Sequence, residues 1–296
     1  MSMSSVLTET SADNEREDVT ERISRFEHVR RKHVGRYVSG TVVLAFVLWI
    51  AMAFAHGQIE WPVVAHFLTA RTILTGLINT VVMAVSAMLL GIVIGVIVAI
   101  MGLSVNPVVK WAAASYVWLF RAAPALLQLL LWYNLALIFP TIGVPWLFEV
   151  RTVDVMTPFV AALVGLGICQ GAYTSEVVRA GLLSVDQGQY EAAKAIGMPP
   201  LQSLWRIILP QAMRVILPPI GNEFIGMVKL TSLASVIQYS EMLHSAENIY
   251  FANNRVIELL TVATVWYLVV VTVFAAMQKR LEWHFARGAG HPGRSR

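Results

Sequence analysis

The sequence predicts an all-α protein that crosses a membrane six times, with both ends of the chain on one side. Two observations support this fold class. Of the 296 residues, 57% are hydrophobic and only 14% are charged, whereas a soluble domain carries about 25% charged residues. Apolar runs recur along the chain, and several reach the roughly 20 residues that a membrane-spanning helix needs. The single cysteine, Cys169, leaves no internal disulfide to consider.

The six predicted spans differ in length and polarity. In chain order they cover residues 38–56, 73–103, 111–139, 156–183, 215–240 and 257–278. The second is long enough to tilt, and the fifth is the most polar. Arg121 and Pro124 interrupt the start of the third, where the missing backbone donor of proline is expected to bend or start a helix. G-x-x-x-G spacing in the second and fourth runs predicts that helix backbones approach closely.

The positions of the basic residues predict the orientation. Eighteen of the 22 Lys and Arg residues fall in the two tails and in the second-to-third and fourth-to-fifth connections. Only Arg71, Arg151 and Arg255 fall on the other side, and Lys229 lies within the fifth run. Because positively charged loops stay in the cytoplasm, both termini and the fourth-to-fifth connection are predicted to be cytoplasmic. The formal charge of +4 is therefore sorted by membrane side and does not indicate a nucleic-acid partner.

Residues 184–212, between the fourth and fifth spans, predict a helical hairpin outside the bilayer. Ser184 and the glutamine three residues later have capping-box spacing for a first helix, which Gly197 and the two following prolines end. Pro200 suits the first position of a second helix, which we expect to stop before Pro210. The small, alanine-rich first helix suits insertion into a groove of another protein. A solvated loop helix is the alternative reading.

The hairpin also carries a sequence motif, Glu-Ala-Ala followed by a glycine at fixed spacing, that occurs in a known protein family. Glu191-Ala192-Ala193, then Gly197 after three residues, then an I-x-L-P stretch at 207–210 resemble the EAA signature of ABC-transporter importer permeases. Among these permeases the chain is most similar to the polar amino acid family, which covers histidine, glutamine, glutamate, arginine and opines. The supporting stretches are FRAAPALLQL at 120–129, TSEVVRAGLLSVDQGQYEAAKAIGM at 174–198 and NEFIGMVKLTSLASVI at 222–237.

The resemblance implies a domain organisation. Residues 72–285 correspond to a five-helix importer-permease core that contains the hairpin. Residues 37–71 add one N-terminal transmembrane helix and an outer loop, so the total is six transmembrane helices. Residues 1–36 form a charged and polar tail that is expected to be disordered, and residues 286–296 form a second cytoplasmic tail. The resemblance further implies a bacterial inner-membrane location.

The resemblance also implies partners. Glu191, Ala192, Ala193 and Gly197 would couple the permease to a cleft on a separate ATP-binding subunit. A second permease copy or a sister permease, an extracytoplasmic solute-binding protein and membrane lipid complete the expected partners. The chain contains no G-x-x-x-x-G-K-[ST] loop, no H-E-x-x-H and no Cys/His cluster. We therefore expect no catalytic residue, metal site or cofactor in this chain, with ATP and Mg²⁺ held by the partner ATPase.

Polar residues inside the spans are candidates for the substrate pathway, because burying them in lipid is costly. These candidates are Gln128, Gln170, Asn222, Glu223, Lys229, Thr231 and Ser232. At 100° per residue, Asn222, Lys229 and Ser232 share one stripe with Gly226. Lys229 lies six residues from Glu223, so it needs another partner: a second helix, water or a substrate carboxylate.

Two functions from different classes remain open at this point. The first is the permease subunit of an ATP-driven importer of polar amino acids. The alternative is an ion-coupled secondary amino acid transporter, which would need no ATPase and would typically show inverted repeats. No repeat is evident in the sequence, and this alternative leaves the hairpin without a role.

Overall fold

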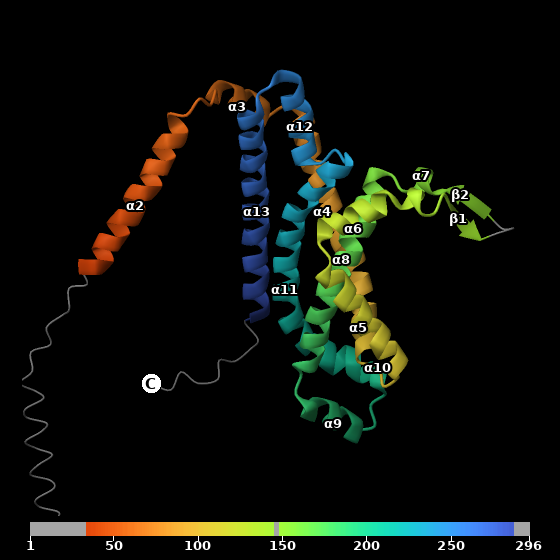
Figure 1. Ribbon diagram of the computed structural model, residues 1–296. Helices are drawn as coiled ribbons and strands as arrows, with labels where there is room; N and C mark the ends of the chain where they lie inside the picture. The colour runs from red at the N-terminus through yellow and green to blue at the C-terminus, as the bar shows by residue number, and fades with distance from the viewer. Residues whose placement is uncertain (1–33, 145–147, 287–296) are drawn as a thin grey trace, which may run out of the picture. The chain divides into compact units, whose positions relative to one another are not determined.

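The computed structural model describes residues 34–144 and 148–286. The chain divides into two compact units, residues 1–59 and 60–296. In the first unit, α2 (Val34–Ala55) is a single apolar helix, and its residues from Val38 onward are long and apolar enough to cross a membrane (Figure 1). Large apolar side chains such as Phe46 and Trp49 are exposed along it. This exposure is expected of a helix that is surrounded by lipid.

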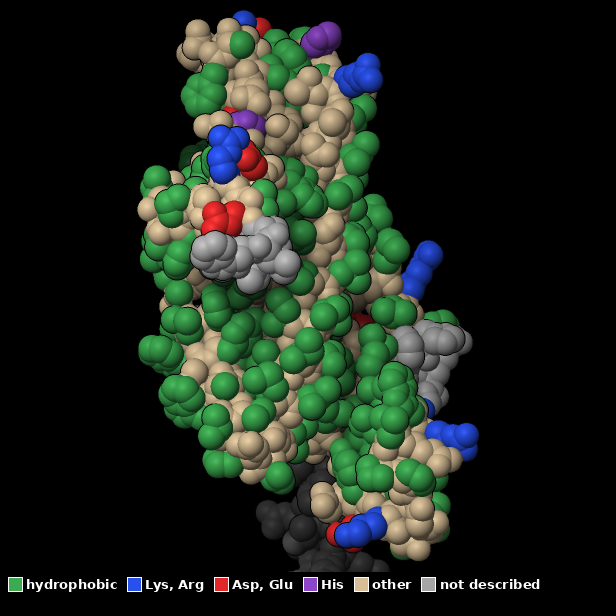
Figure 2. Space-filling view, turned by 90° about the vertical axis from the view of Figure 1, so that its right-hand side faces the viewer, with side chains coloured by type: hydrophobic (Ala, Val, Ile, Leu, Met, Phe, Trp, Pro, Cys, Tyr) green, Lys and Arg blue, Asp and Glu red, His purple; other side chains and the backbone are tan. Residues whose placement is uncertain are grey.

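The second unit contains the remaining predicted spans. Its long helices are α4 (Arg71–Gly102), α8 (Pro158–Leu183), α11 (Leu209–Leu230) and α13 (Val256–Ala286). The third predicted span is a broken pair, α5 (Pro107–Ala122) and α6 (Ala125–Tyr133), with 101° between the two helices. The described residues therefore contain five candidate spans, or six if the bent pair counts as one. Hydrophobic side chains cover most of the face in Figure 2, as expected for a surface in lipid.

The centre of the second unit is the close packing of α4 against α8. A Cβ atom added to Gly95 would lie 2.7 Å from the Thr174 side chain and 3.0 Å from the Ser175 backbone nitrogen. On the facing helix, a Cβ at Gly167 would lie 2.7 Å from the Leu90 side chain. No side chain fits at these distances, so the helices can approach this closely only with glycine at these positions. The G-x-x-x-G spacing thus marks a tightly packed helix pair.

The fifth span begins earlier than the sequence predicts. The second helix of the hairpin starts as α10 (Pro200–Ser203), passes through a π-helical turn (Leu204–Ile208) and continues directly into α11. The expectation that this helix stops before Pro210 was therefore wrong. Proline lacks the backbone N–H that an α-helix needs. The π turn before Pro210 changes the local pattern of backbone hydrogen bonds, so the helix continues past this proline. Beyond α11, residues Thr231–Ile237 form a 3₁₀ helix.

Several short elements were not predicted. Residues Trp61–Leu68 form α3, which packs against α13, and Met242–Asn253 form α12, which packs against α4 and α13. Residues Leu135–Leu137 form a 3₁₀ turn and Thr152–Val155 form α7. Two antiparallel strands, β1 (Thr141–Val144) and β2 (Phe148–Arg151), pair in register from Thr141–Arg151 to Val144–Phe148. These strands are the one departure from an all-α fold within the described residues.

Candidate functional site

The hairpin begins with α9 (Gln187–Ala195), directly after α8. Asp186, not Ser184, is its N-cap: the Asp186 carboxylate accepts a hydrogen bond of 2.8 Å from the Gly188 backbone nitrogen. The Ser184 hydroxyl instead donates to the Gly181 carbonyl oxygen at 2.7 Å, at the end of α8. The capping-box prediction was wrong by two residues, because a closer side-chain acceptor follows Ser184.

Gly197 ends α9, as the sequence predicts. It adopts φ +70°, the left-handed conformation that favours glycine. The Gly197 nitrogen donates to the Lys194 carbonyl, and the Met198 nitrogen donates to the Ala193 carbonyl, both at 3.0 Å. This pair of bonds is a Schellman motif, which satisfies the last carbonyls of the helix. The chain then turns into α10 with a defined geometry.

One face of α9 holds the hairpin to the spans. Ala193 is only 2% exposed, and Tyr190 donates from its hydroxyl to the Leu182 carbonyl at 2.9 Å. Gln211 adds a hydrogen bond of 3.2 Å to Gln189, which ties α9 to α11. Partial burial raises the pKa of the Tyr190 phenol, so this hydroxyl remains a donor at neutral pH. The hairpin is therefore anchored to both helices that it connects.

The opposite face of the hairpin is exposed. Glu191, Ala192 and Gly197 are all exposed, and Gly197 has no atom within 4 Å of an added Cβ. Three large apolar side chains of the hairpin are also exposed: Ile196 (73%), Leu201 (67%) and Trp205 (62%). These three residues were missed in the sequence. The signal for them was the presence of apolar residues in a segment outside the spans, because exposed apolar side chains in such a segment form a surface for a partner.

A second candidate site lies between α8 and α11. Gln170 and Glu223 come together: the Gln170 amide donates to a Glu223 carboxylate oxygen at 2.8 Å. Thr174, one turn beyond Gln170, donates to the same oxygen at 3.0 Å and accepts from Gln170 at 3.1 Å. Gln170 and Thr174 are buried and Glu223 is partly buried. Thr174 was missed, although its i+4 spacing from Gln170 places both on one helix face.

The other polar positions of α11 point elsewhere. Asn222 and Lys229 are exposed, and Gly226 between them has no atom within 4 Å of an added Cβ. Within the described part of the chain, the Lys229 ammonium makes no hydrogen bond or ion pair. Thr231 and Ser232 lie beyond the end of α11, and their hydroxyls donate to the Val228 and Lys229 carbonyls at 2.8 Å. The stripe predicted from Asn222 to Ser232 is therefore interrupted where the 3₁₀ helix begins.

Gln128 lies at the break between α5 and α6. Its amide nitrogen donates to the Phe120 carbonyl at 3.0 Å and to the Ala123 carbonyl at 2.9 Å. These carbonyls lie in the last turn of α5 and at its C-cap, where no helical donor follows. The Gln128 side chain is buried, and its amide oxygen has no hydrogen-bond partner in the structure. Gln128 thus satisfies the broken helix end and does not join the Gln170–Glu223 cluster.

No group of three or more His, Cys, Asp or Glu side chains that could hold a metal ion occurs among residues 34–144 and 148–286. The arrangement instead offers an exposed docking face on a rigid hairpin and polar groups inside the spans. The docking face lies on α9 and the turn after it, and the polar groups lie on α8 and α11, the two helices that the hairpin connects.

Comparison with curated proteins gives relatives of one kind. The arginine transport system permease protein ArgU of Corynebacterium glutamicum is 36% identical over 261 residues, which is 87% of this chain and 82% of that protein. The probable amino-acid permease protein YxeN of Bacillus subtilis is 36% identical over 211 residues, covering 71% of this chain and 90% of that protein. The nopaline transport system permease protein NocM of Agrobacterium fabrum is 35% identical, covering 69% and 84%.

Solved structures agree with these relatives. The crystal structure of an amino acid ABC transporter with histidines superposes with a TM-score of 0.63 at 32% identity, covering 72% of this chain and 94% of that one. An inward-facing structure of the MetNI methionine ABC transporter gives a TM-score of 0.59, covering 72% and 96%; at 17% identity it supports the fold alone.

The family model for the binding-protein-dependent transport system inner membrane component matches residues 91–286. The match includes α8, the hairpin, α11 and α13, and the described features of the hairpin fall inside it. Proteins of this kind are permease subunits and not enzymes. The chain belongs to the family of binding-protein-dependent transport system inner membrane components.

Proposed function

We propose that this chain is the permease subunit of an ABC importer for a polar amino acid, and that the hairpin couples it to a separate ATPase. The observation that carries the coupling role is the exposed hairpin face around Glu191 and Ala192 on α9; the hairpin then continues through α10 directly into α11. The amino acid substrate class rests on the relatives, which are named for arginine, nopaline and other amino acids. An ion-coupled transporter would leave this face unexplained.

The hairpin transmits movement because both of its ends are fixed. Tyr190 fastens α9 to the end of α8, and α10 runs without interruption into α11. A push on the exposed face therefore moves α8 and α11 together. ATP binding to the partner has to stabilise one arrangement of these helices over the other, since a ligand shifts an equilibrium only through differential affinity. In this proposal the partner ATPase holds the ATP and Mg²⁺.

The polar groups of α8 and α11 are proposed to line the pathway. The Glu223 carboxylate, held by Gln170 and Thr174, is suited to an α-amino group. Lys229, which is exposed and unpaired within the described residues, is suited to a substrate carboxylate. These side chains lie on α8 and α11, which are the helices that the hairpin moves in this proposal. We assign Asn222 to the same exposed stripe, and Gln128, Thr231 and Ser232 to support of the helix ends.

The proposed assembly follows from the charge distribution and the family. The hairpin and both termini face the cytoplasm, where the ATPase subunits dock. A second permease copy or a sister permease closes the pathway against the exposed stripe of α11. An extracytoplasmic binding protein delivers the substrate to the opposite end, which includes α12 and the β1–β2 hairpin.

The coupling role is tested with Glu191→Arg in vesicles that contain the assembled transporter. We expect the variant to fold normally, to lose most of the co-purifying ATPase subunit and to lose ATP-dependent uptake of labelled amino acid. Lys279→Glu is the matched control, because Lys279 is an exposed cation near the end of α13 and takes no part in the hairpin. Normal ATPase binding and normal uptake in Glu191→Arg would exclude the coupling role.

The pathway role is tested separately with Lys229→Met. Removing a charge-assisted contact is expected to lower uptake by about tenfold while ATPase binding stays normal. Labelled arginine, glutamine and glutamate are compared in the same vesicles to identify the substrate. If Lys229→Met and the control Lys279→Met transport equally well, the side chain of Lys229 does not contact the substrate.

A further inference from the structure

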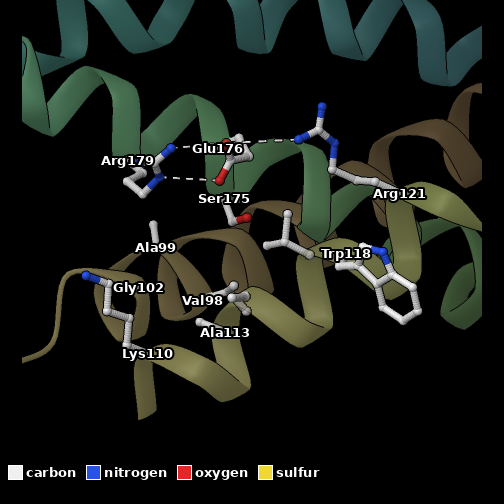
Figure 3. A pocket seen from close by; sticks show the side chains of 12 residues that line it. Val98, Ala99, Gly102, Lys110, Ala113, Trp118, Arg121, Ser175, Glu176 and Arg179 are labelled. Atoms are coloured by element: carbon white, nitrogen blue, oxygen red, sulfur yellow. Dashed lines mark hydrogen bonds and ion pairs between the residues drawn. The ribbon is translucent and has the colours of Figure 1, made fainter. Parts of the chain in front are cut away.

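A cavity of about 350 Å³ lies where α4, α5 and α8 meet (Figure 3). Its floor is apolar and includes Val98 of α4 and Ala113 of α5. Its rim carries three cationic side chains, Lys110, Arg121 and Arg179, and one carboxylate, Glu176. None of these four charged residues belongs to the hairpin or to the Gln170–Glu223 cluster.

The charges of the rim do not balance. Both guanidinium groups share the single carboxylate of Glu176. The Arg179 guanidinium lies 3.2 Å from this carboxylate, and the Arg121 guanidinium lies 4.0 Å from it. Figure 3 shows Glu176 between the two arginines. The ammonium of Lys110 is exposed and makes no hydrogen bond or ion pair with any residue that the structure describes. The rim therefore retains a net positive charge that is available to an anion.

The helix ends around the cavity indicate a position near the boundary between membrane and water. Gly102, in its lining, is the last residue of α4, and Lys110 is in the first turn of α5. Arg179 is one turn from the end of α8. Trp118, also in the lining, leaves 72% of its surface exposed, and tryptophan gathers at the headgroup level of bilayers. A ligand in this cavity would thus have a polar part at the headgroup level and an apolar part among the helices.

We propose that this cavity binds the headgroup of an anionic phospholipid, with the phosphate at Lys110 and Arg179 and an acyl chain along the apolar floor. A basic pocket between transmembrane helices near the membrane surface is suited to such a headgroup. The second guanidinium, Arg121, lies over the Tyr173 ring at 5.4 Å, which fixes its position beside the site. A bound lipid would then join α5 and α8 at the end of the bundle that leads into the hairpin.

The test measures lipid binding to the full-length protein in its assembled complex by native mass spectrometry. Phosphatidylglycerol and phosphatidylcholine are titrated separately, because they differ in net charge. We expect phosphatidylglycerol to bind more tightly, and Lys110→Gln to weaken it by about fivefold, the effect of one basic residue near a membrane surface. Lys279→Gln, which removes an exposed cation near the end of α13, is expected to leave binding unchanged.

Several outcomes would overturn the proposal. Equal binding of the two lipids would exclude recognition of the anionic headgroup. Equal effects of Lys110→Gln and Lys279→Gln would place the bound lipid elsewhere. Displacement of the lipid by inorganic phosphate would identify a free-anion site, and displacement by free arginine would identify a substrate site. Arg179→Gln provides a second variant in the cavity, with the same expected loss of phosphatidylglycerol.

Discussion

The α4–α8 interface and the hairpin are both rich in small residues, but they use them in opposite ways. At the interface, Gly95 and Gly167 remove side chains so that two backbones can approach, and no space is left. In the hairpin, Ala192 and Gly197 are exposed, and Gly197 has no atom near an added Cβ. Small residues at the interface serve internal packing, whereas those of the hairpin leave space that a partner can fill. Spacing alone does not distinguish these uses, but the packing around each residue does.

The largest expected loss of stability comes from Gly95→Val, which should disrupt the α4–α8 interface. The added Cβ would lie 3.0 Å from the Ser175 backbone nitrogen, which cannot move away as a side-chain end can. Overpacking of this kind costs about 3 kcal/mol or more when backbones must separate. The yield of monodisperse protein and its Tm measure the loss. Gly226→Val is the control, since no atom lies within 4 Å of that position; similar losses in both variants would contradict the packing argument.

The second expected effect is a pH dependence of stability, and it comes from a buried carboxyl near the other end of α4. Glu241, the N-cap of α12, is fully buried, accepts hydrogen bonds from the Tyr267 hydroxyl at 2.7 Å and the His244 nitrogen at 2.7 Å, and lies 3.5 Å from the Thr80 hydroxyl. Burial raises the pKa of this carboxyl from 4.5 to about 7, with the nearby Glu247 acting in the same direction.

Because the folded protein binds this proton more tightly than the unfolded chain, the contribution of Glu241 to thermal stability should be fully present below about pH 4.5 and be lost as the pH rises through about 7. Tm measured across this window checks the prediction. In Glu241→Gln the same window is expected to be flatter, since the titrating group is absent. An unchanged slope in that variant would assign the pH dependence to other groups.

A smaller effect is expected when the buried and the exposed faces of α9 are substituted separately. Ala193 is 2% exposed and Ala192 is exposed. Ala193→Leu overfills its site and should loosen the hairpin by about 1–3 kcal/mol, which limited proteolysis between α9 and α10 would detect. Ala192→Leu should leave proteolysis unchanged and weaken only the binding of the ATPase subunit. If both variants are cleaved at equal rates, α9 does not pack through the Ala193 face.

The smallest effect is expected from Gly197→Ala. No atom obstructs the added methyl group, so the cost comes from the φ of +70° alone and is about 1 kcal/mol. Hydrogen exchange of the Met198 amide, which donates to the Ala193 carbonyl, reports on this local opening. Gly197→Asn is expected to recover most of the protection, since asparagine tolerates the left-handed region. Equal exchange in the two variants would argue against backbone strain as the cause.

The sequence predicted what depends on local pattern. The spans follow from hydrophobic length, and the end of α9 follows from Gly197 and the prolines after it. The start of α9 was misplaced because Ser184 and Asp186 are both good caps, and only the structure shows which one bonds a free amide. The helix past Pro210 was missed because a π turn depends on packing as well as on residue type.

The sequence did not predict what depends on tertiary contact. The cluster of Gln170, Thr174 and Glu223 joins residues about 50 positions apart, and no local pattern pairs them. Gln128 was predicted as a pathway residue because it is polar within a span; its hydrogen bonds to the end of α5 could not be predicted, because they depend on the break between α5 and α6. The short helix α12 was not predicted, although Glu241 caps it in the same way as Asp186 caps α9.

The broken pair α5–α6 has a consequence for how the protein enters the membrane during synthesis. The two helices have 16 and 9 residues, and each is shorter than the roughly 20 residues that insert independently. The carbonyls at the end of α5 find their donor in Gln128, four residues after the break at Pro124. We therefore expect that neither half is stable as a finished span by itself. Both halves pack against α8, so we expect the third crossing to be completed only after the fourth has been made.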